Sequence, residues 1–175
     1  MRAERVQRRF RGEWRHKVDA KGRVSIPAPF RRVLERDDPD WTPGDLANLV
    51  LVFGRKSRGC LEGYSMAGID EIDDIIAQLP KFSREREALS RMLSTHSRQI
   101  QLEETGRIVL SQTLRDQVGI TNEAVFAGMT DRFQIWEPGA FDADNAQLGD
   151  WVRGEADEED DIFALLHAAQ ERLAQ

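Results

Sequence analysis

Lysine and arginine side chains gather around two short turns, and they are the residues of this chain best suited to bind a ligand. Lys17, Lys21 and Arg23 surround the first turn, and Arg107 follows the second. Such cations can approach phosphates closely, and the forked guanidinium of arginine can donate two hydrogen bonds to a guanine edge. The pattern favours a nucleic-acid surface, although lysine and arginine also serve simply to keep strand edges in solvent.

Residues for catalysis or metal binding do not form a recognisable pattern. His16, His96 and His167 lie on a predicted strand, a predicted helix and the tail, with no spacing typical of metal ligands or of a nucleophile and its base. Cys60 is the only cysteine, which suits a small core residue, and the glycines form no phosphate-binding loop. We therefore expect no enzyme activity, metal, cofactor or small-molecule substrate.

An internal repeat positions the cations. The segment from Val18 to Pro27 returns 84 positions later as Leu102 to Ser111, and Phe30-Arg31 returns as Leu114-Arg115 in the same register. Repeats of this kind decide the architecture, because each copy is one supersecondary unit. The sequence therefore predicts two similar modules related by a pseudo-twofold axis within the chain.

Each copy is predicted to fold as strand, tight turn, strand and short helix. Asp19 and Gly22 form the first turn, and Glu103 and Gly106 form the second, because aspartate favours turn starts and glycine accepts a positive φ. Alternating apolar residues on the flanking strands face inward, which leaves Arg23 and its counterpart in the second copy on the outer side. We expect Asp19 to hold Arg23 in a charge-assisted hydrogen bond.

Further β-like stretches and two helices complete the predicted order. The strands are expected at 49–53, 60–64, 124–127 and 132–136, and the two helices, interpreted as a packed connector rather than as recognition helices, lie between the copies. The expected domains are a basic arm at 1–9, the first module at 10–65, the helical connector at 66–96, the second module at 97–141 and an acidic extension at 142–175.

Charge is distributed unevenly along the chain. Its net charge is −6, yet residues 1–36 hold twelve Lys and Arg against four Asp and Glu, and residues 137–175 hold two against eleven. These segments therefore carry net charges of +8 and −9. The acidic block at 155–161 precedes a predicted short helix at 162–173. Such blocks are usually solvated extensions, and the alternative is that this one folds back on the basic face.

The motifs resemble those of the bacterial MraZ family. They are Phe10-Arg11-Gly12-Glu13-Trp14, the stretch from Asp19 to Pro27, Phe30-Arg31, and the late aromatic stretch from Arg132 to Trp136. The resemblance covers roughly residues 10–140, including the second copy. It departs at Glu103, where the family usually has Asp, and at Ser111, where it usually has Pro. Ser111 loses proline's rigid ring but is predicted to cap the helix that follows.

The resemblance implies an α+β fold of two tandem AbrB-like (SpoVT-AbrB) modules, each a swapped-hairpin β-barrel. It also implies ring-shaped homo-oligomers and transcriptional regulation through double-stranded DNA, at repeated short sites in the promoter of the division and cell-wall gene cluster. The expected location is the cytoplasm, at the nucleoid, with no membrane partner. The predicted DNA contacts are Lys17, Lys21, Arg23, Arg31, Arg32, Arg107 and Arg115, with Arg15 and Arg98 as secondary candidates.

One alternative from another class stays open. The same modules could serve mainly as an antitoxin-like partner binder with a minor role on DNA. A protein captured through the helix at 162–173, without salt-dependent DNA retention, would favour that alternative.

Overall fold

The computed structural model describes residues 9–54, 59–155 and 162–174. It separates into two compact units, residues 1–138 and 139–175. Most of the predicted basic arm, residues 1–8, and most of the acidic block, residues 156–161, lie outside the described residues. No helix in the described part of the chain combines the length and apolarity needed to cross a bilayer.

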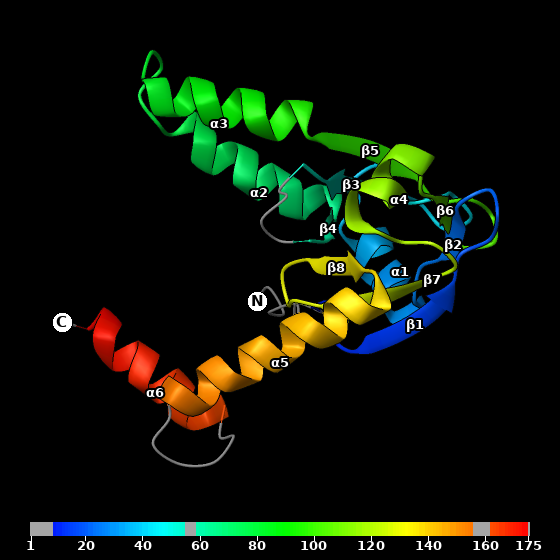
Figure 1. The fold of residues 1–175 in the computed structure, drawn as a ribbon. Helices are drawn as coiled ribbons and strands as arrows, with labels where there is room; N and C mark the ends of the chain where they lie inside the picture. The colour runs from blue at the N-terminus through cyan, green and yellow to red at the C-terminus, as the bar shows by residue number, and fades with distance from the viewer. Residues whose placement is uncertain (1–8, 55–58, 156–161, 175) are drawn as a thin grey trace, which may run out of the picture. The chain divides into compact units, whose positions relative to one another are not determined.

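The first unit is an α+β structure, as predicted (Figure 1). Its strands are β1 (Glu13–Lys17), β2 (Arg23–Ser25), β3 (Asn48–Val52), β4 (Leu61–Tyr64), β5 (Ser97–Gln101), β6 (Arg107–Val109), β7 (Glu123–Gly128) and β8 (Phe133–Trp136). Its helices are α1 (Ala28–Arg36), α2 (Met66–Ala77), α3 (Arg84–Thr95) and α4 (Gln112–Val118).

The strand order follows the repeat. Six strands form one antiparallel sheet in the order β1-β7-β8-β4-β3-β5, and β2 pairs with β6 separately. Exchanging each strand for its counterpart in the other copy reverses this order onto itself, so the sheet has a pseudo-twofold between β8 and β4. The described strands thus form an open sheet and a separate two-stranded ladder, and no continuous hydrogen-bonded barrel closes around them.

Pairing exchanges strands between the copies. The first copy's β1 pairs with β7 of the second copy, and β5 of the second copy pairs with β3 of the first. The short ladder joins the copies directly, with Val24 opposite Ile108 at its centre. Neither copy can therefore complete its strand pairing alone.

A single core holds the two copies together. Phe30 from α1 is fully buried, and its ring lies 5.3 Å from that of Phe10 and 5.2 Å from that of Phe133. Trp14 packs edge-on against Phe30 at 5.1 Å. Aromatic pairs at these separations add to the stabilisation from their buried area. Mixing residues from both copies in this way makes the first unit one cooperative structure.

The two short helices begin differently. Pro27 precedes α1 without a side-chain cap, whereas the Oγ of Ser111 accepts a hydrogen bond from Leu114 N at 3.3 Å at the start of α4. Gly119 ends α4 with φ +74°. Ser111 thus replaces proline's rigid ring with a helix cap, as the sequence predicted.

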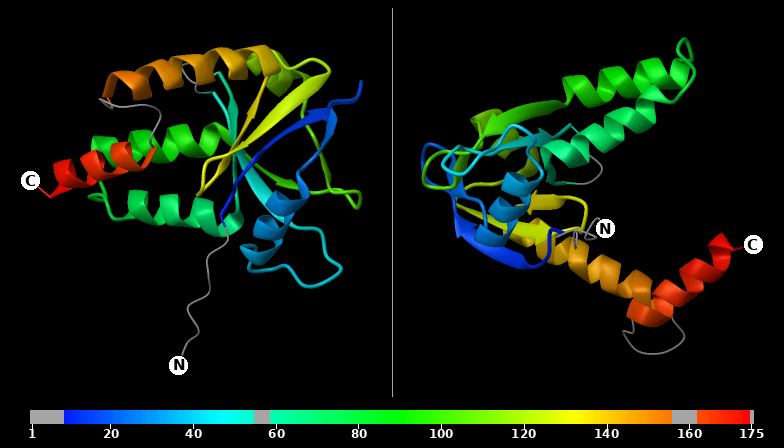
Figure 2. Two further views of the ribbon diagram at one scale, coloured as in Figure 1. Left: turned by 90° about the horizontal axis from the view of Figure 1, so that it is seen from below. Right: turned by 180° about the vertical axis from the view of Figure 1, so that it is seen from behind.

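Helices α2 and α3 lie side by side and extend beyond the sheet (Figure 2). Ser65 and Ser83 cap their first turns, and α2 ends shortly before Pro80. The two helices contact each other, but little of the pair is buried. Only Ile69 is buried on α2, and no residue is buried on α3. Because the pair extends past the sheet edge (Figure 2), the residues described in this unit leave most of its apolar stripe uncovered.

The second unit consists of helices. These are α5 (Pro138–Glu155) and α6 (Ile162–Leu173), which confirms the predicted helix after the acidic block. Arg172 forms an ion pair with Glu155, with Nη1 and Oε2 3.6 Å apart. Ile162, Phe163 and Leu166 are exposed, so the apolar side of α6 faces solvent.

Candidate nucleic-acid interface

The first turn is held by its own carboxylate. The Oδ1 atom of Asp19 accepts hydrogen bonds from the backbone N of Lys21 and of Arg23, both at 2.9 Å. Its Oδ2 atom accepts a third from Arg23 Nε at 2.7 Å. The backbone and side-chain N–H groups of Arg23 hold the pKa of Asp19 below its ordinary value. The predicted charge-assisted bond between Asp19 and Arg23 is therefore confirmed.

The second turn has the same backbone and different side-chain contacts. Gly106 N donates to Glu103 O at 2.8 Å, matching Gly22 N to Asp19 O at 2.9 Å. Arg107 Nε, however, lies 3.9 Å from Glu103 Oε2 and donates to Thr105 Oγ1 at 2.8 Å. The longer glutamate keeps the turn but not the close pair with arginine.

Arginines from the two copies share one outward face. In the β2–β6 ladder Arg23 pairs with Val109 and Ser25 pairs with Arg107, so the two arginines are diagonal neighbours. Diagonal positions of an antiparallel pair lie about 7–8 Å apart. Between them, Val24 and Ile108 face the core. The pairing of β2 with β6 is thus what brings Arg23 and Arg107 together.

A hollow of about 560 Å³ opens beside this face. Its lining includes three of the predicted cationic residues, Lys17, Arg23 and Arg107. It also includes Ser25, Asn122 and Glu123, which sequence reasoning missed. Val18 N donates to Asn122 O at 2.9 Å, and β1 pairs with β7, so the loop before β7 reaches this position only through pairing between the copies. No local pattern signals such a contact.

The remaining candidates take different positions. Lys21 is exposed in the first turn, and Arg32 is exposed on α1. Arg31 on α1 and Arg115 on α4 are half-buried and lie against the glycines of the opposite copy's turns. The secondary candidates Arg15, on β1, and Arg98, on the edge strand β5, are both exposed and do not line this hollow.

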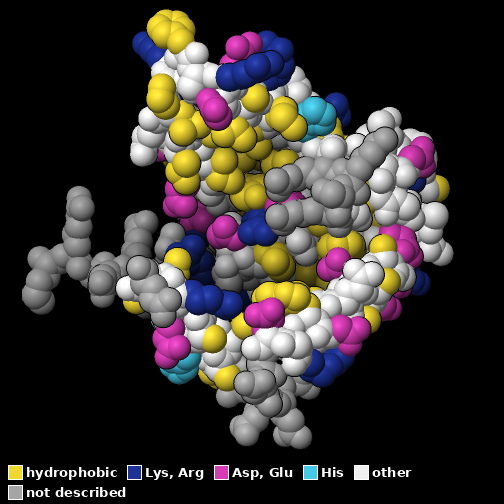
Figure 3. Space-filling model, turned by 60° about the vertical axis from the view of Figure 1, so that its left-hand side comes forward, with side chains coloured by type: hydrophobic (Ala, Val, Ile, Leu, Met, Phe, Trp, Pro, Cys, Tyr) yellow, Lys and Arg dark blue, Asp and Glu magenta, His cyan; other side chains and the backbone are white. Residues whose placement is uncertain are grey.

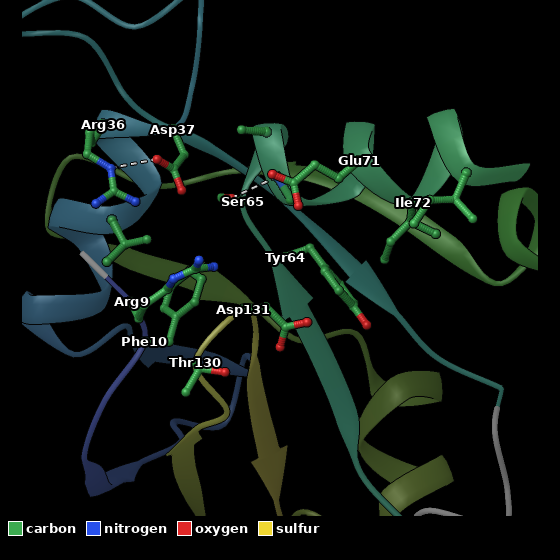
Figure 4. A pocket seen from close by; sticks show the side chains of 14 residues that line it. Arg9, Phe10, Arg36, Asp37, Tyr64, Ser65, Glu71, Ile72, Thr130 and Asp131 are labelled. Atoms are coloured by element: carbon green, nitrogen blue, oxygen red, sulfur yellow. Dashed lines mark hydrogen bonds and ion pairs between the residues drawn. The ribbon is translucent and has the colours of Figure 1, made fainter. Parts of the chain in front are cut away.

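A second hollow, of about 170 Å³, lies between α1, the start of α2 and the loop before β8 (Figure 4). Arg9, Arg36, Asp37, Glu71 and Asp131 line it, so cations and carboxylates are mixed. Arg36 Nε donates to Asp37 Oδ1 at 2.6 Å. Most of these charges are balanced nearby, and this hollow was not predicted as a site.

Buried charge supports the wall of that second hollow. Glu62 on β4 is 4% exposed at its side chain and pairs with Arg132, with Oε2 and Nε 2.8 Å apart. The hydroxyl of Tyr64 donates to the same oxygen at 3.0 Å. Burial and the Glu62 carboxylate raise the pKa of Tyr64, so this hydroxyl stays a neutral donor. We interpret the cluster as a structural link between β4 and the loop before β8.

The described residues contain no group of three or more His, Cys, Asp or Glu side chains placed to hold a metal ion. Cys60 is buried, which fits its interpretation as a core residue. Nothing in the geometry around the turns suggests an activated nucleophile.

Comparison with known proteins identifies the family. The family model described as "MraZ protein, putative antitoxin-like" matches residues 9–92 and again 93–160. A relative from Ruegeria sp. (strain TM1040), named transcriptional regulator MraZ, is 50% identical over 135 residues, which are 77% of this chain and 81% of the relative. Relatives of the same name from Ruegeria pomeroyi and Cereibacter sphaeroides are 48% and 44% identical, covering 84% and 78% of this chain and 89% and 84% of theirs.

Both matches of the family model fall on the two copies found in the sequence, and the relatives share the name of a regulator. The chain therefore belongs to the MraZ family of transcriptional regulators.

Proposed function

We propose that the chain regulates transcription by binding double-stranded DNA through the outward face of the β2–β6 ladder and its two turns. The observation that carries this proposal is the pair Arg23 and Arg107, brought by different copies to one face of a two-stranded ribbon. The major groove of B-DNA admits such a ribbon, and arginine is the most frequent reader of guanine there. Arg23 and Arg107 are thus assigned to base edges.

The other cations surround this ribbon. Lys17 and Lys21 flank the first turn and are exposed, as is Arg32 on α1. We assign these three to phosphates, which fix the register of a protein on DNA. Arg31 and Arg115 add positive charge behind this surface from half-buried positions on the helices.

A single module of this kind would bind DNA only weakly. Non-specific affinity from a few phosphate contacts lies around 10⁻⁴ to 10⁻⁶ M at physiological salt. We therefore propose a ring-like homo-oligomer, in which linked modules bind repeated short sites and multiply the affinity. By family resemblance the sites lie in the promoter of the division and cell-wall gene cluster, and the protein acts in the cytoplasm at the nucleoid.

The finer fold assignment belongs to the same proposal. Each copy sends its first strand to pair with the other copy, and β2 pairs with β6. This exchange supports a swapped-hairpin arrangement of AbrB type, with the two modules of one chain taking the place of two subunits.

The proposal is tested by titrating the full chain into duplex DNA from the promoter upstream of its own gene, at two salt concentrations. Arg23→Ala should weaken binding roughly 5-fold to 150-fold, corresponding to about 1–3 kcal/mol for a lost base contact. Arg91→Ala is the matched control, because Arg91 is exposed on α3 and pairs with Glu87. Equal affinity of all three proteins, or no binding at all, would contradict the proposal.

The antitoxin-like alternative has its own support. The family description contains that term, and α6 exposes apolar side chains. If the folded chain does not bind DNA, the next experiment is to capture partner proteins with it. Loss of a captured protein on Phe163→Ser would then favour partner binding as the main function.

A further inference from the structure

The glycine of each turn is enclosed by the other copy. Gly22 has φ +84°, and a Cβ there would lie 2.1 Å from the carbonyl oxygen of Leu110. Gly106 has φ +74°, and a Cβ there would lie 2.2 Å from Nη1 of Arg31. Side chains rarely accept this φ. At Gly22 a Cβ would also overlap a backbone carbonyl, whereas at Gly106 the Arg31 side chain would have to move aside. The close approach of the other copy is thus built into both turns.

Backbone hydrogen bonds cross between the copies at the same places. Leu110 N donates to Gly22 O at 2.8 Å, and Ile26 N donates to Gly106 O at 3.0 Å. Each turn is therefore tied to the strand end that leads into the opposite copy's helix. The strand end at Leu110 leads into α4, which carries Arg115, and the strand end at Ile26 leads into α1, which carries Arg31.

One arginine covers each of these junctions. Arg115 Nε donates to Leu110 O at 3.0 Å and lies 3.0 Å from where a Cβ of Gly22 would be. Arg31 occupies the equivalent position in the first copy, with its guanidinium against Gly106. Arg32, the next residue along the helix, is exposed instead. The two half-buried arginines are therefore placed to support turns more than to reach a ligand.

We propose that Arg31 and Arg115 are positioning residues, each carried by the helix of one copy and fixing the DNA-binding turn of the other. At Arg115 the planar guanidinium covers the glycine while its Nε donates to a carbonyl, which a lysine ammonium does not do. Arg31 acts by packing on Gly106, because its buried Nε makes no hydrogen bond to a described residue. The orientation of Arg23 thus depends on Arg115, and that of Arg107 on Arg31. This inference rests on the proposed DNA-binding function of the turns.

The structural half of the proposal is tested without DNA, by hydrogen exchange of backbone amides in the full chain. Arg115→Ala should speed exchange at Gly22 and Arg23 at least several-fold while leaving Gly106 and Arg107 unchanged. Arg31→Ala should do the reverse. Arg32→Ala is the control and should change neither turn. Effects confined to the mutated copy's own turn, or no effect at all, would overturn the proposal.

Global destabilisation must be separated from this crossed pattern. Amides of the buried strand β7, such as that of Val125, report it, because Val125 is fully buried and far from both turns in the sequence. Should Arg115→Ala unfold, Arg115→Lys keeps the charge and most of the stem. It should still speed exchange at Gly22, and full protection in that variant would overturn the role assigned to the guanidinium.

The functional half is a double-mutant cycle on the same promoter duplex. Arg115→Ala should weaken binding, and adding it to Arg23→Ala should cost less than about a further 2-fold, because both changes remove one contact. Added to Arg107→Ala, it should keep its full effect. If Arg115 instead touched a phosphate, the salt slope of the Arg23→Ala protein would fall by about a further 0.9. That result would overturn the positioning role.

The two halves separate the possible failures. Absence of DNA binding by the wild-type chain would reject the proposed function, while the crossed exchange pattern would still establish the support of the turns. Normal DNA binding without the crossed pattern would reject the positioning role and leave the proposed function intact.

Discussion

Asp19 and Glu103 occupy equivalent positions and differ by one methylene, which changes what their carboxylates reach. Asp19 accepts from two backbone amides of its own turn and from Arg23 Nε. Glu103 leaves Arg107 Nε at 3.9 Å. Arg23 is consequently held close to its carboxylate, whereas Arg107 is held by a threonine hydroxyl.

Exchanging these two residue types should therefore change DNA affinity in opposite directions. Asp19→Glu should weaken binding and Glu103→Asp should strengthen it, each by about 2-fold to 5-fold, the lower end of a hydrogen-bond contribution because these side chains are partly exposed. Titration of the promoter duplex measures both. If Asp19→Glu binds as tightly as the wild-type chain, the Asp19–Arg23 contact does not orient the arginine.

The lowered pKa of Asp19 predicts a pH dependence of the first turn. Because the folded-state pKa is depressed below the unfolded value of about 3.9, the stabilisation is fully present above that value. It is lost as the pH falls through the folded-state pKa. NMR titration of the Asp19 carboxyl group measures this. A midpoint for Asp19 at or above about 3.9 would contradict the hydrogen bonds described.

At the scale of elements, each turn is held in place because a strand end of the other copy is hydrogen-bonded to its glycine. Gly22 and Gly44 both have positive φ, +84° and +98°, but their surroundings differ. A Cβ on Gly22 would meet the Leu110 carbonyl at 2.1 Å, whereas one on Gly44 would meet nothing within 4 Å. A comparison of substitutions at Gly22 and Gly44 therefore separates the cost of the positive φ from the cost of steric overlap.

Gly44→Ala should lower the free energy of unfolding by about 1 kcal/mol, from its φ alone. Gly22→Ala should lower it by at least about 2–3 kcal/mol, because the backbone of the other copy must also move. Urea unfolding of both variants measures the difference. Equal losses in the free energy of unfolding would mean that the backbone at the β2–β6 junction can move to accept a Cβ without a further loss of stability.

The helical connector shows an element whose burial the periodicity overestimated. The apolar periodicity predicted two helices here, and the structure has α2 and α3. Their apolar residues, however, line a hollow of about 340 Å³ that is open to solvent, as the yellow surface beside them shows (Figure 3). Periodicity indicates an apolar face and does not say what covers it.

At the scale of the whole molecule, that open face supports the proposed oligomer. Met92 and Leu89, which line it, are 63% and 47% exposed. An apolar surface of this kind on a monomer often marks a protein interface.

Met92→Glu should therefore reduce the oligomer to smaller species without unfolding the chain, because Met92 contributes little to the core of one subunit. Light scattering after size-exclusion chromatography measures the mass. Ser90→Glu, an exposed change on the same helix, is the control and should leave the mass unchanged. An unaltered mass for Met92→Glu would place the subunit contacts elsewhere.

The sequence by itself determined the repeat, the order of strands and helices and the two turns, because each depends on local periodicity, turn chemistry and caps. It also predicted the Asp19–Arg23 bond, whose partners are four residues apart. The resemblance of its motifs predicted the family, and the comparisons with known proteins confirmed it. The list of DNA contacts remains a prediction.

Only the tertiary structure decided which side chains meet across the copies. Pairing of β2 with β6 places Arg23 beside Arg107, and pairing of β1 with β7 brings Asn122 to their edge. The meeting of the two copies also places Arg31 against Gly106 and Arg115 against Gly22, about 75 and 93 positions away in the chain. Such contacts depend on register between distant strands, which is set by the burial of a shared core and leaves no periodic signal in either segment.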